Sequence, residues 1–395
     1  MTAAPQSLPR LRVGMVGYAF MGRAHSHAWR TAPRFFELPM LPELTVLAGR
    51  DEAAARVAAE TLGWTDVETD WRTLVARDDV DLVDICTPGD THAEIAVAAL
   101  DAGKHVLCEK PLANSVAEAE AMAAAAARAA ERGVVAMVGF SFRRVPAIQL
   151  ARQLVAEGRI GTVRHVRAQY LQDWLADAQA PLSWRLDRQK AGSGALGDIG
   201  AHIVDLTQFI TGERLTELTA MLETFVTERP VATGFSGLSG TGGTERGPVT
   251  VDDAAVFMGR LGGGALATFE ATRFAWGRRN SIRLDIDGTD GALAFDFEDM
   301  NVLQHFDAHD DPRVAGFRRI QVTQPVHPYT GSWWPAGHGL GYEHAFTHQV
   351  VDLVRGIAAG HNPEPTFADG LQVQRVLAAV ERSAQGRTWE RVETA

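Results

Sequence analysis

The strongest constraint on the fold of this 395-residue sequence is an alternation of short apolar runs with longer alanine-rich stretches over residues 12–142. Valine, isoleucine and leucine dominate the runs, which is typical of strands buried on both faces, whereas the intervening stretches favour helices. Helices of that length serve as the right-handed crossovers that parallel strands need. The sequence therefore predicts a doubly wound α/β domain at residues 1–142, with strands at residues 12–17, 44–49, 80–88, 104–109 and 134–140.

Residues 143–395 follow a different pattern, in which longer strands alternate apolar and polar residues. Such alternation is typical of an antiparallel sheet with one face buried and the other open to solvent or to another subunit. We expect an α+β domain here, built on a large open antiparallel sheet whose buried face is covered by helices at residues 197–211, 342–359 and 368–386. The glycine-rich segment 231–248 fits a hairpin tip, and a substrate lid is the alternative.

Charge and cysteine content exclude several classes of protein. The formal net charge of −11 argues against a general affinity for nucleic acid or for an anionic membrane. Cys86 and Cys108, the two cysteines, lie inside apolar runs, so we expect neither a disulfide framework nor a cysteine metal cluster, and a cytoplasmic location. The thirteen histidines include no His-Glu-x-x-His motif, and we expect no metal site.

A glycine-containing turn follows the first predicted strand and opens a helix. Gly17 and Gly22 occupy the first and last glycine positions of a Gly-x-Gly-x-x-Gly turn, and Ala19 takes the middle one. In such a turn, backbone N–H groups at the start of the helix bind a pyrophosphate, and the methyl group of alanine is a mild obstruction. We therefore predict a dinucleotide site that includes Phe20 and Met21, the alternative being a tight turn without a ligand.

The end of the second strand bears on the choice between NAD and NADP. An acidic residue usually binds the adenosine ribose at this point, but here the chain continues Ala48-Gly49-Arg50-Asp51. The guanidinium of Arg50 suits a 2′-phosphate, which a carboxylate would repel. NADP is favoured over NAD on this ground, unless Arg50 is merely a solvated residue and Asp51 binds the ribose instead.

Two further motifs carry a family resemblance. Glu109-Lys110-Pro111 follows the fourth strand, and Thr87-Pro88-Gly89-Asp90-Thr91-His92 follows the third. Together with the turn at Gly17, these motifs resemble the Gfo/Idh/MocA oxidoreductase family over nearly the whole chain. The resemblance implies an N-terminal Rossmann dinucleotide-binding domain at residues 1–142 and a C-terminal α+β domain at residues 143–395 for substrate binding and oligomerisation, in a homodimer or homotetramer.

The same resemblance suggests a catalytic group. Asp198 and His202 lie four residues apart at the start of a helix, so they share a face one turn apart, as in the family's Asp-x-x-x-His pair. A secondary alcohol releases hydride only if its hydroxyl proton leaves, and a neutral imidazole is a suitable base. His202 is the candidate base. Lys110 is the candidate that donates a hydrogen bond to the hydroxyl or helps to relay its proton, and Asp198 either orients His202 or holds a neighbouring hydroxyl. Without the Glu-Lys-Pro motif, a helix cap and a buried histidine would explain the pair.

The remaining site residues rest on the turn and on the resemblance together. Trp184-Arg185 resembles a family segment near the cofactor, although each tryptophan could equally be core packing. Arg143-Arg144 lies where the two domains join and could equally form an interdomain salt bridge. The predicted substrate residues are Arg144, Asp173 and Trp174. The predicted cofactor residues are Gly17, Ala19, Phe20, Met21, Arg50, Thr87, Pro88, His92, Glu109, Lys110, Trp184 and Arg185. The resemblance also implies a cis Lys110–Pro111 bond.

Four segments resemble the sugar dehydrogenase branch of the family that includes levoglucosan dehydrogenase; they lie at residues 19–26, 170–174, 181–185 and 192–199. The resemblance implies an NAD(P)-dependent oxidoreductase that moves a hydride between a secondary hydroxyl of a pyranose-like sugar, anhydrosugar or polyol and the nicotinamide. Two alternatives stay open on the same fold. One is a redox-neutral NAD-dependent glycosidase, and the other is a non-catalytic regulator that senses a dinucleotide.

Overall fold

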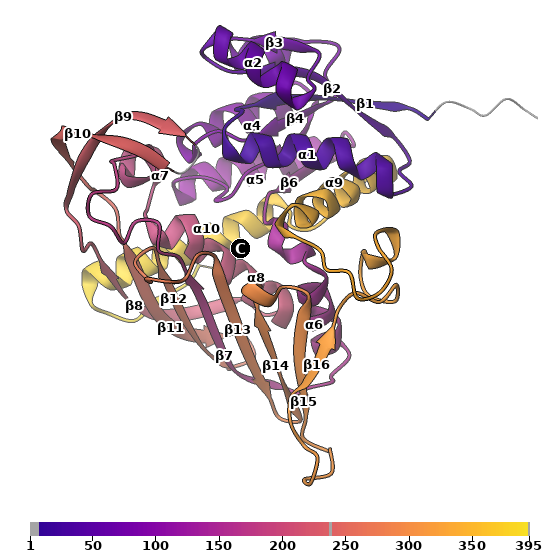
Figure 1. The fold of residues 1–395 in the computed structure, drawn as a ribbon, viewed down its shortest axis with the longest axis vertical. Coiled ribbons are helices and arrows are strands. Elements are labelled where there is room, and N and C mark those ends of the chain that lie inside the picture. The colour runs from indigo at the N-terminus through magenta and orange to yellow at the C-terminus, as the bar shows by residue number, and fades with distance from the viewer. Residues whose placement is uncertain (1–7, 237–238, 394–395) are drawn as a thin grey trace, which may run out of the picture. The chain divides into compact units, whose positions relative to one another are not determined.

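The computed structural model describes residues 8–236 and 239–393, which fall into two compact units (Figure 1). The first unit contains the chain up to Leu112 together with Ala117–Gly139 and Tyr342–Asp369. The second contains Ala113–Val116, Phe140–Gly341 and the chain from Gly370 onward. The sequence pattern suggested one boundary after residue 142, but the chain passes between the two units at several points.

The first unit is built on a parallel sheet with the strand order β3-β2-β1-β4-β5-β6. Every neighbouring pair is parallel, and the order reverses between β1 and β4, as in a doubly wound dinucleotide-binding fold. The predicted α/β class is confirmed, and the short strand β3 is an addition to it. The strands are β1 (Arg10–Val16), β2 (Leu41–Ala48), β3 (Asp66–Glu68), β4 (Leu82–Ile85), β5 (His105–Cys108) and β6 (Ala136–Val138).

Helices alternate with these strands, and their ends follow local chemistry. In α2, for example, the Asp51 carboxylate accepts the N–H of Ala54 at the start, and Gly63 ends the helix at a φ of 86°. A carboxylate cap and a left-handed glycine are the usual signals at these two ends. The helices of this unit are α1 (Phe20–Phe35), α2 (Glu52–Leu62), α3 (Trp71–Ala76), α4 (His92–Asp101), α5 (Val116–Ala130) and α9 (Tyr342–Ala359).

Helix α9 packs differently from the prediction. We expected it to cover the sheet of the second domain, but it packs against α1: Phe20 stacks on Tyr342, and Phe36 meets His348 edge to face. The helical periodicity of the segment showed that it has an apolar face, but it could not show which sheet or helix that face would meet. This prediction was wrong for that reason.

The second unit contains a large, mostly antiparallel sheet with the order β16-β15-β14-β13-β7-β12-β11-β8-β17. The pairing of β7 with β12 is parallel, in contrast to its other neighbouring pairs. In β11, buried residues alternate with exposed ones, so one face is covered and the other is open. The strands are β7 (Val163–Leu171), β8 (Leu215–Glu223), β11 (Ala254–Leu261), β12 (Leu266–Thr272), β13 (Ser281–Gly288), β14 (Gly291–Asp296), β15 (Val302–Asp307), β16 (Arg318–Gln321) and β17 (Glu390–Arg391).

The segment predicted as a hairpin tip forms a hairpin of its own. Strands β9 (Glu228–Ser236) and β10 (Ser239–Pro248) pair with each other, apart from the large sheet, and residues 237–238 lie outside the described residues. The longer helices of this unit are α6 (Pro146–Ala156), α8 (Ala201–Thr211) and α10 (Phe367–Gly386). None of the helices in residues 8–236 and 239–393 is both long and apolar enough to cross a membrane.

Candidate active site

The turn after β1 is packed so tightly that it requires glycine at two positions. Gly17 has a φ of 95°, and a Cβ there would lie 2.9 Å from the carbonyl oxygen of Cys86. A Cβ on Gly22 would lie 2.3 Å from the carbonyl oxygen of Gly17. Both distances are too short for a side chain, so the start of α1 lies directly against the turn.

The predicted residues between these glycines begin α1. Ala19 precedes the helix with a φ of −72°, which any residue adopts, so alanine is tolerated where the usual motif has glycine. Its side chain makes no capping hydrogen bond, and the N–H groups of the first turn face outward from the helix end. Phe20 stacks on Tyr342 at 6.2 Å between ring centroids, and Met21 is partly buried.

At the end of β2, Gly49 also provides space for a neighbour. A Cβ on Gly49 would lie 2.0 Å from the ring of Tyr18, so this ring lies directly over the main chain at Gly49. Arg50 follows and is exposed, whereas the Asp51 carboxylate is engaged in capping α2. This arrangement leaves the guanidinium of Arg50 at the surface beside the end of the strand.

His92 connects the ends of β4 and β5. Its Nε2 lies 2.9 Å from the carbonyl oxygen of Thr87, and its Nδ1 lies 3.0 Å from that of Pro111. The Lys110–Pro111 bond is cis, as the resemblance implied. His92 is 1% exposed. It is therefore placed to hold the main chain beside Lys110, and both of its ring nitrogens face carbonyl groups of the protein.

These features fit a bound dinucleotide. Gly17, Arg50, Thr87 and Lys110 follow β1, β2, β4 and β5, at the carboxyl edge of the sheet, and the strand order reverses between β1 and β4. Ligands of open parallel sheets bind at such a reversal, and the start of a helix packed tightly against a glycine turn suits a pyrophosphate. A nicotinamide dinucleotide bound there supplies a hydride acceptor or donor.

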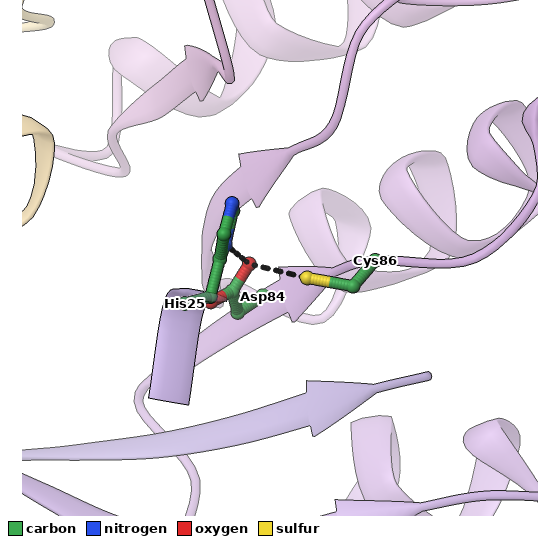
Figure 2. Close-up of side chains that lie close together, drawn as sticks. All are labelled: His25, Asp84 and Cys86. Atoms are coloured by element: carbon green, nitrogen blue, oxygen red, sulfur yellow. Dashed lines mark hydrogen bonds and ion pairs between the residues drawn. The ribbon is translucent and has the colours of Figure 1, made fainter. Parts of the chain in front are cut away.

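A buried polar cluster lies below this edge, within the first unit (Figure 2). His25 Nδ1 lies 2.9 Å from Asp84 Oδ1, and His25 Nε2 lies 3.1 Å from Glu109 Oε1. Burial opposes a charge on His25, but the Asp84 carboxylate outweighs it and holds the pKa of His25 well above 6.5. Burial likewise raises the pKa of the Cys86 thiol.

The same cluster contains three side chains of the kinds that bind metal ions. One ligand atom from each of His25, Asp84 and Cys86 lies within 4.8 Å of the others. Burial raises the pKa of Cys86, which favours the protonated thiol, and this thiol donates to Asp84 Oδ1 at 3.5 Å. The Asp84 carboxylate also accepts the indole N–H of Trp29 at 2.7 Å. The arrangement therefore suits hydrogen bonding, and the absence of a metal site stays a prediction.

In the second unit, Asp198 lies in a π-helical turn, Leu196–Gly200, that leads into α8. The turn is held by Asp252, whose carboxylate accepts the N–H groups of Gly194 at 2.7 Å and Leu196 at 2.8 Å. A Cβ on Gly194 would lie 1.7 Å from the carbonyl oxygen of Asp252, so only glycine fits. Because π-helical turns are rare and frequent at functional sites, the one that carries Asp198 is notable.

Two guanidinium groups lie near Asp198. Arg273, which is fully buried, places Nη1 3.5 Å from Asp198 Oδ2 and donates from Nη2 to the Asp252 carbonyl. Burial lowers the pKa of Arg185, while the Asp198 charge opposes that shift. Arg185 also lies over the ring of Trp184 at 4.5 Å. The Asp198 carboxylate is therefore paired with the Arg273 guanidinium and also interacts electrostatically with that of Arg185.

His202 is 6% exposed and lies among aromatic rings. The centroid of its ring is 4.6 Å from that of Phe142, 5.8 Å from that of Phe140 and 5.9 Å from that of Tyr170. The rings fix the orientation of the imidazole by packing. Asp198 and His202 therefore come from one continuous helical segment, while Lys110 belongs to the first unit.

The predicted substrate residues have mainly structural contacts within the second unit. Arg144 is 2% exposed, and its neighbour Arg143 pairs with Asp205 of α8 at 2.6 Å, so this pair lies inside one unit. The Asp173 carboxylate accepts the N–H of Gly277 and pairs with Arg279. Trp174 packs against an apolar cluster of Leu175, Leu186, Val249 and Val251. The contacts of Trp174 agree with the alternative that it is core packing. The salt bridge of Arg143 with Asp205 lies within the second unit and does not join the two units.

Comparison with known proteins gives a consistent relationship. Residues 11–140 match the family model described as an oxidoreductase family with an NAD-binding Rossmann fold, and residues 148–294 match the GFO/IDH/MocA C-terminal domain. The chain is 41% identical to levoglucosan dehydrogenase of Pseudarthrobacter phenanthrenivorans over 387 residues, which cover 97% of this chain and 98% of that protein. The chain belongs to the Gfo/Idh/MocA family of oxidoreductases.

Solved structures of Gfo/Idh/MocA proteins are similar over the full length. An oxidoreductase domain protein from Kribbella flavida is 69% identical, with a TM-score of 0.94 over 98% of this chain and 100% of that one. Levoglucosan dehydrogenase in complex with NADH and levoglucosan is 40% identical, with a TM-score of 0.92 and the same coverage. The sequence-based recognition of the family and its sugar dehydrogenase branch is therefore confirmed.

Sequence reasoning missed four residues that shape this Gfo/Idh/MocA site. Tyr18 lies over Gly49, Asp252 and Arg273 hold the segment that carries Asp198, and Asp84 pairs with His25. The glycines at 192, 194 and 197 signalled a tightly packed segment, but not its partner almost sixty residues further on. Asp84 was visible only as one polar residue inside an apolar strand, which is itself a signal of a buried partner.

Replacing Gly22 with alanine tests the dinucleotide turn. The added Cβ meets the carbonyl oxygen of Gly17, so the start of α1 must move away from the turn. We expect Gly22→Ala to weaken NADH binding, measured by fluorescence titration, by at least about tenfold, equivalent to about 1.4 kcal/mol. Gly316→Ala is the matched control, since a Cβ there meets nothing within 4 Å. Equal affinity of both variants would contradict the assignment of this turn.

Proposed function

We propose that this protein is an NAD(P)-dependent dehydrogenase that moves a hydride between a secondary hydroxyl of a pyranose-like sugar, anhydrosugar or polyol and the nicotinamide. The observation that carries this proposal is the full-length similarity to levoglucosan dehydrogenase at 41% identity. Lys110, Asp198 and His202 stand in this chain at the positions where the family resemblance expects them. A regulator that only binds a dinucleotide has no need of such a group.

The three residues have distinct chemical roles in this proposal. His202, its ring fixed among aromatic side chains, accepts the proton of the substrate hydroxyl as the hydride leaves the same carbon. Lys110 donates a hydrogen bond to that hydroxyl oxygen and stabilises the negative charge that develops on it. Asp198, held by Arg273, orients the substrate or His202.

We assign the choice between NAD and NADP to Arg50. Its guanidinium makes no hydrogen bond or ion pair within residues 8–236 and 239–393, and Asp51 is engaged in capping α2. The guanidinium of Arg50 is therefore available at the end of β2, where the adenosine ribose of a dinucleotide binds, while the Asp51 carboxylate is occupied. A cation at this point favours the 2′-phosphate of NADP. Levoglucosan dehydrogenase, on the other hand, was solved with NADH. We propose that both cofactors bind and that Arg50 provides the affinity for NADP.

Reduction of the nicotinamide by candidate sugars tests the activity. NAD and NADP are offered separately with levoglucosan, inositols, free hexoses and alkyl glucosides, and absorbance of the reduced cofactor is followed. We expect sugar-dependent reduction by the wild type, and a loss of at least about a hundredfold in Lys110→Ala, because an oxyanion donor contributes about 10²–10³. Lys190→Ala, at an exposed position, is the control and should retain activity.

Cofactor binding by Lys110→Ala completes this test. Unchanged NADH affinity with lost turnover supports the catalytic role of Lys110. Turnover that survives in Lys110→Ala would contradict the mechanism. Release of an aglycone without net reduction of the cofactor would instead favour the redox-neutral glycosidase, and cofactor binding without any turnover would favour the regulator.

Removal of the Arg50 side chain tests the cofactor assignment. We expect Arg50→Ala to raise the KM for NADP about tenfold or more while the KM for NAD stays within about twofold, since a charge-assisted bidentate contact is worth about 1.5–3 kcal/mol. Arg56→Ala, an exposed arginine on α2 that pairs with Glu52, is the matched control. An equal effect of Arg50→Ala on both cofactors would contradict the role of Arg50.

We further propose that the open face of the large sheet joins a second copy of the chain. On this face Val256 lies directly opposite Met221 in the neighbouring strand, with exposed fractions of 53% and 75%, and Met258 is 44% exposed. Such a row of apolar side chains on a flat sheet is costly in water and suits a symmetric interface.

Light scattering on the purified protein tests this interface. We expect the wild type to have the mass of two or four chains, and Met258→Arg to shift it to a smaller species, because an unpaired charge in an apolar interface is destabilising. Val57→Arg, at an exposed apolar position of α2, is the control. A wild type with the mass of one chain, or an assembly unaffected by Met258→Arg, would contradict the proposal.

We also propose a cytoplasmic location. Cys86 and Cys108 are free thiols, and both are buried in the first unit. Free thiols are typical of proteins in a reducing compartment.

A further inference from the structure

The Ala24-His25-Ser26 segment of α1 has no role in the function proposed so far, yet His25 belongs to a buried cluster, and Figure 2 shows its contact with Asp84. The side chains of His25 and Asp84 are 1% and 0% exposed, and Glu109 is 4% exposed. Each belongs to a different element: His25 to the helix that begins at the dinucleotide turn, Asp84 to β4, and Glu109 to the motif that contains Lys110. A charged cluster buried at this place needs an explanation, because burying charge is costly.

His25 lies between two carboxyl groups and contacts each of them with a different ring nitrogen. Its Nδ1 lies 2.9 and 3.0 Å from the two oxygens of Asp84, and its Nε2 lies 3.1 Å from Glu109 Oε1. Ionised carboxylates only accept hydrogen bonds, and a neutral imidazole has one N–H to donate. When both carboxylates are ionised, only the imidazolium makes both contacts, which agrees with the raised pKa of His25.

Glu109 is held on both of its oxygens. Oε1 faces His25, and Oε2 accepts the backbone N–H of Lys110 at 3.2 Å. From the other side, the main chain at Gly139 is so close that a Cβ there would lie 2.7 Å from Oε1. The Glu109 side chain thus has one available position, and that position fixes the peptide that leads into Lys110.

The remaining neighbours isolate the cluster from water. Trp29, one helical turn after His25, donates its indole N–H to Asp84 Oδ2 at 2.7 Å. Phe346 of α9 packs against His25 at 5.6 Å between ring centroids. Burial raises the pKa of Tyr342, also on α9, and the charge of Glu109 adds to that rise, so this tyrosine lies near the same carboxylate. In such surroundings the hydrogen bonds are strong and their loss is costly.

We propose that His25 is a positioning residue for the dehydrogenase reaction, which links α1 to Glu109 and thereby fixes the main chain of Lys110. This inference rests on the proposed function, because it gives His25 an effect on the turnover that Lys110 supports. It differs from a purely structural role: His25 acts on Lys110 through Glu109, whereas its pairing with Asp84 serves to stabilise the fold. The two contacts of one imidazole can therefore be separated by mutation.

The variants are chosen to make this separation. His25→Gln replaces the cation between Asp84 and Glu109 with a neutral amide, so it lowers both stability and turnover. The double variant His25→Gln with Asp84→Asn removes one buried carboxylate as well, which restores stability but not the charged contact with Glu109. His27→Gln is the matched control on the same helix, because His27 is exposed. Thermal unfolding and circular dichroism report the stability and folding of each variant.

The kinetic readout separates positioning from binding. We expect His25→Gln and the double variant to lower kcat about a hundredfold, the size of effect that a displacement near 1 Å produces. The KM for the sugar and the affinity for NADH should change by less than about threefold, since neither ligand is bound by His25. Recovery of kcat in the double variant together with its stability would overturn the proposal, because His25 would then be structural only.

A spectroscopic readout is independent of the substrate. Lys104, Lys110 and Lys190 are the three lysines of the sequence, so reductive ¹³C-methylation gives three resolved lysine signals, assigned with arginine variants. In both His25 variants we expect the Lys110 signal to move or broaden while the other two signals stay. An unchanged Lys110 signal would overturn the proposal even if no sugar is oxidised. A wild type without turnover would instead count against the proposed function, and the two failures are thereby distinguishable.

Discussion

The candidate site depends on the close approach of main-chain segments at the carboxyl ends of β1 and β4. At Gly17 the chain turns with a positive φ, and its Cα lies so near the carbonyl of Cys86 that a side chain has no room. The start of α1 then packs directly against this turn at Gly22. The strand order reverses beside this turn, and the same turn sets the direction of α1. The N-terminal end of α1 therefore faces the carboxyl edge of the sheet, where ligands of such folds bind.

Asp252 has the corresponding role in the second unit. Its carboxylate binds two N–H groups of the segment before the π-helical turn, and its carbonyl accepts from Ala195 and Arg273. Arg273 in turn lies against Asp198. A carboxylate and a guanidinium at the ends of two neighbouring sheet strands therefore set the position of Asp198. In both units, reactive groups on short irregular segments are held by the ends of a rigid sheet, which is the arrangement that preorganises a site.

The sequence predicted the local elements of this chain better than their contacts. The parallel strands, the helix at residues 342–359 and the alternating strands of the large sheet follow from periodicity, because a buried face leaves a regular trace. The partner of α9, the parallel pairing of β7 with β12 and the short strand β3 depend on contacts between distant segments, which periodicity does not contain. The glycine-rich segment 231–248 predicted a hairpin tip, but not that strands β9 and β10 pair with each other apart from the large sheet.

The same difference holds for the site. Gly17, Lys110, Asp198 and His202 stood out because they belong to motifs. His25 and Asp84 did not, although Asp84 is a charged residue in an apolar strand and Trp29 lies one turn from His25. Their roles depend on which nitrogen faces which carboxylate, and only the folded chain brings residues 25, 84 and 109 together. A single buried charge in the sequence predicts that a partner exists, but not which residue it is.

The central claim is that a hydride passes from a sugar carbon to a dinucleotide that leaves the protein in its reduced form. The most direct measurement is the fate of deuterium from a sugar labelled at the carbon that bears the reacting hydroxyl, followed by mass spectrometry of the cofactor. Our account predicts one deuterium in the released reduced cofactor and a ketone at the labelled carbon. Deuterium that returns to the sugar product, or stays on an unchanged sugar, would contradict it.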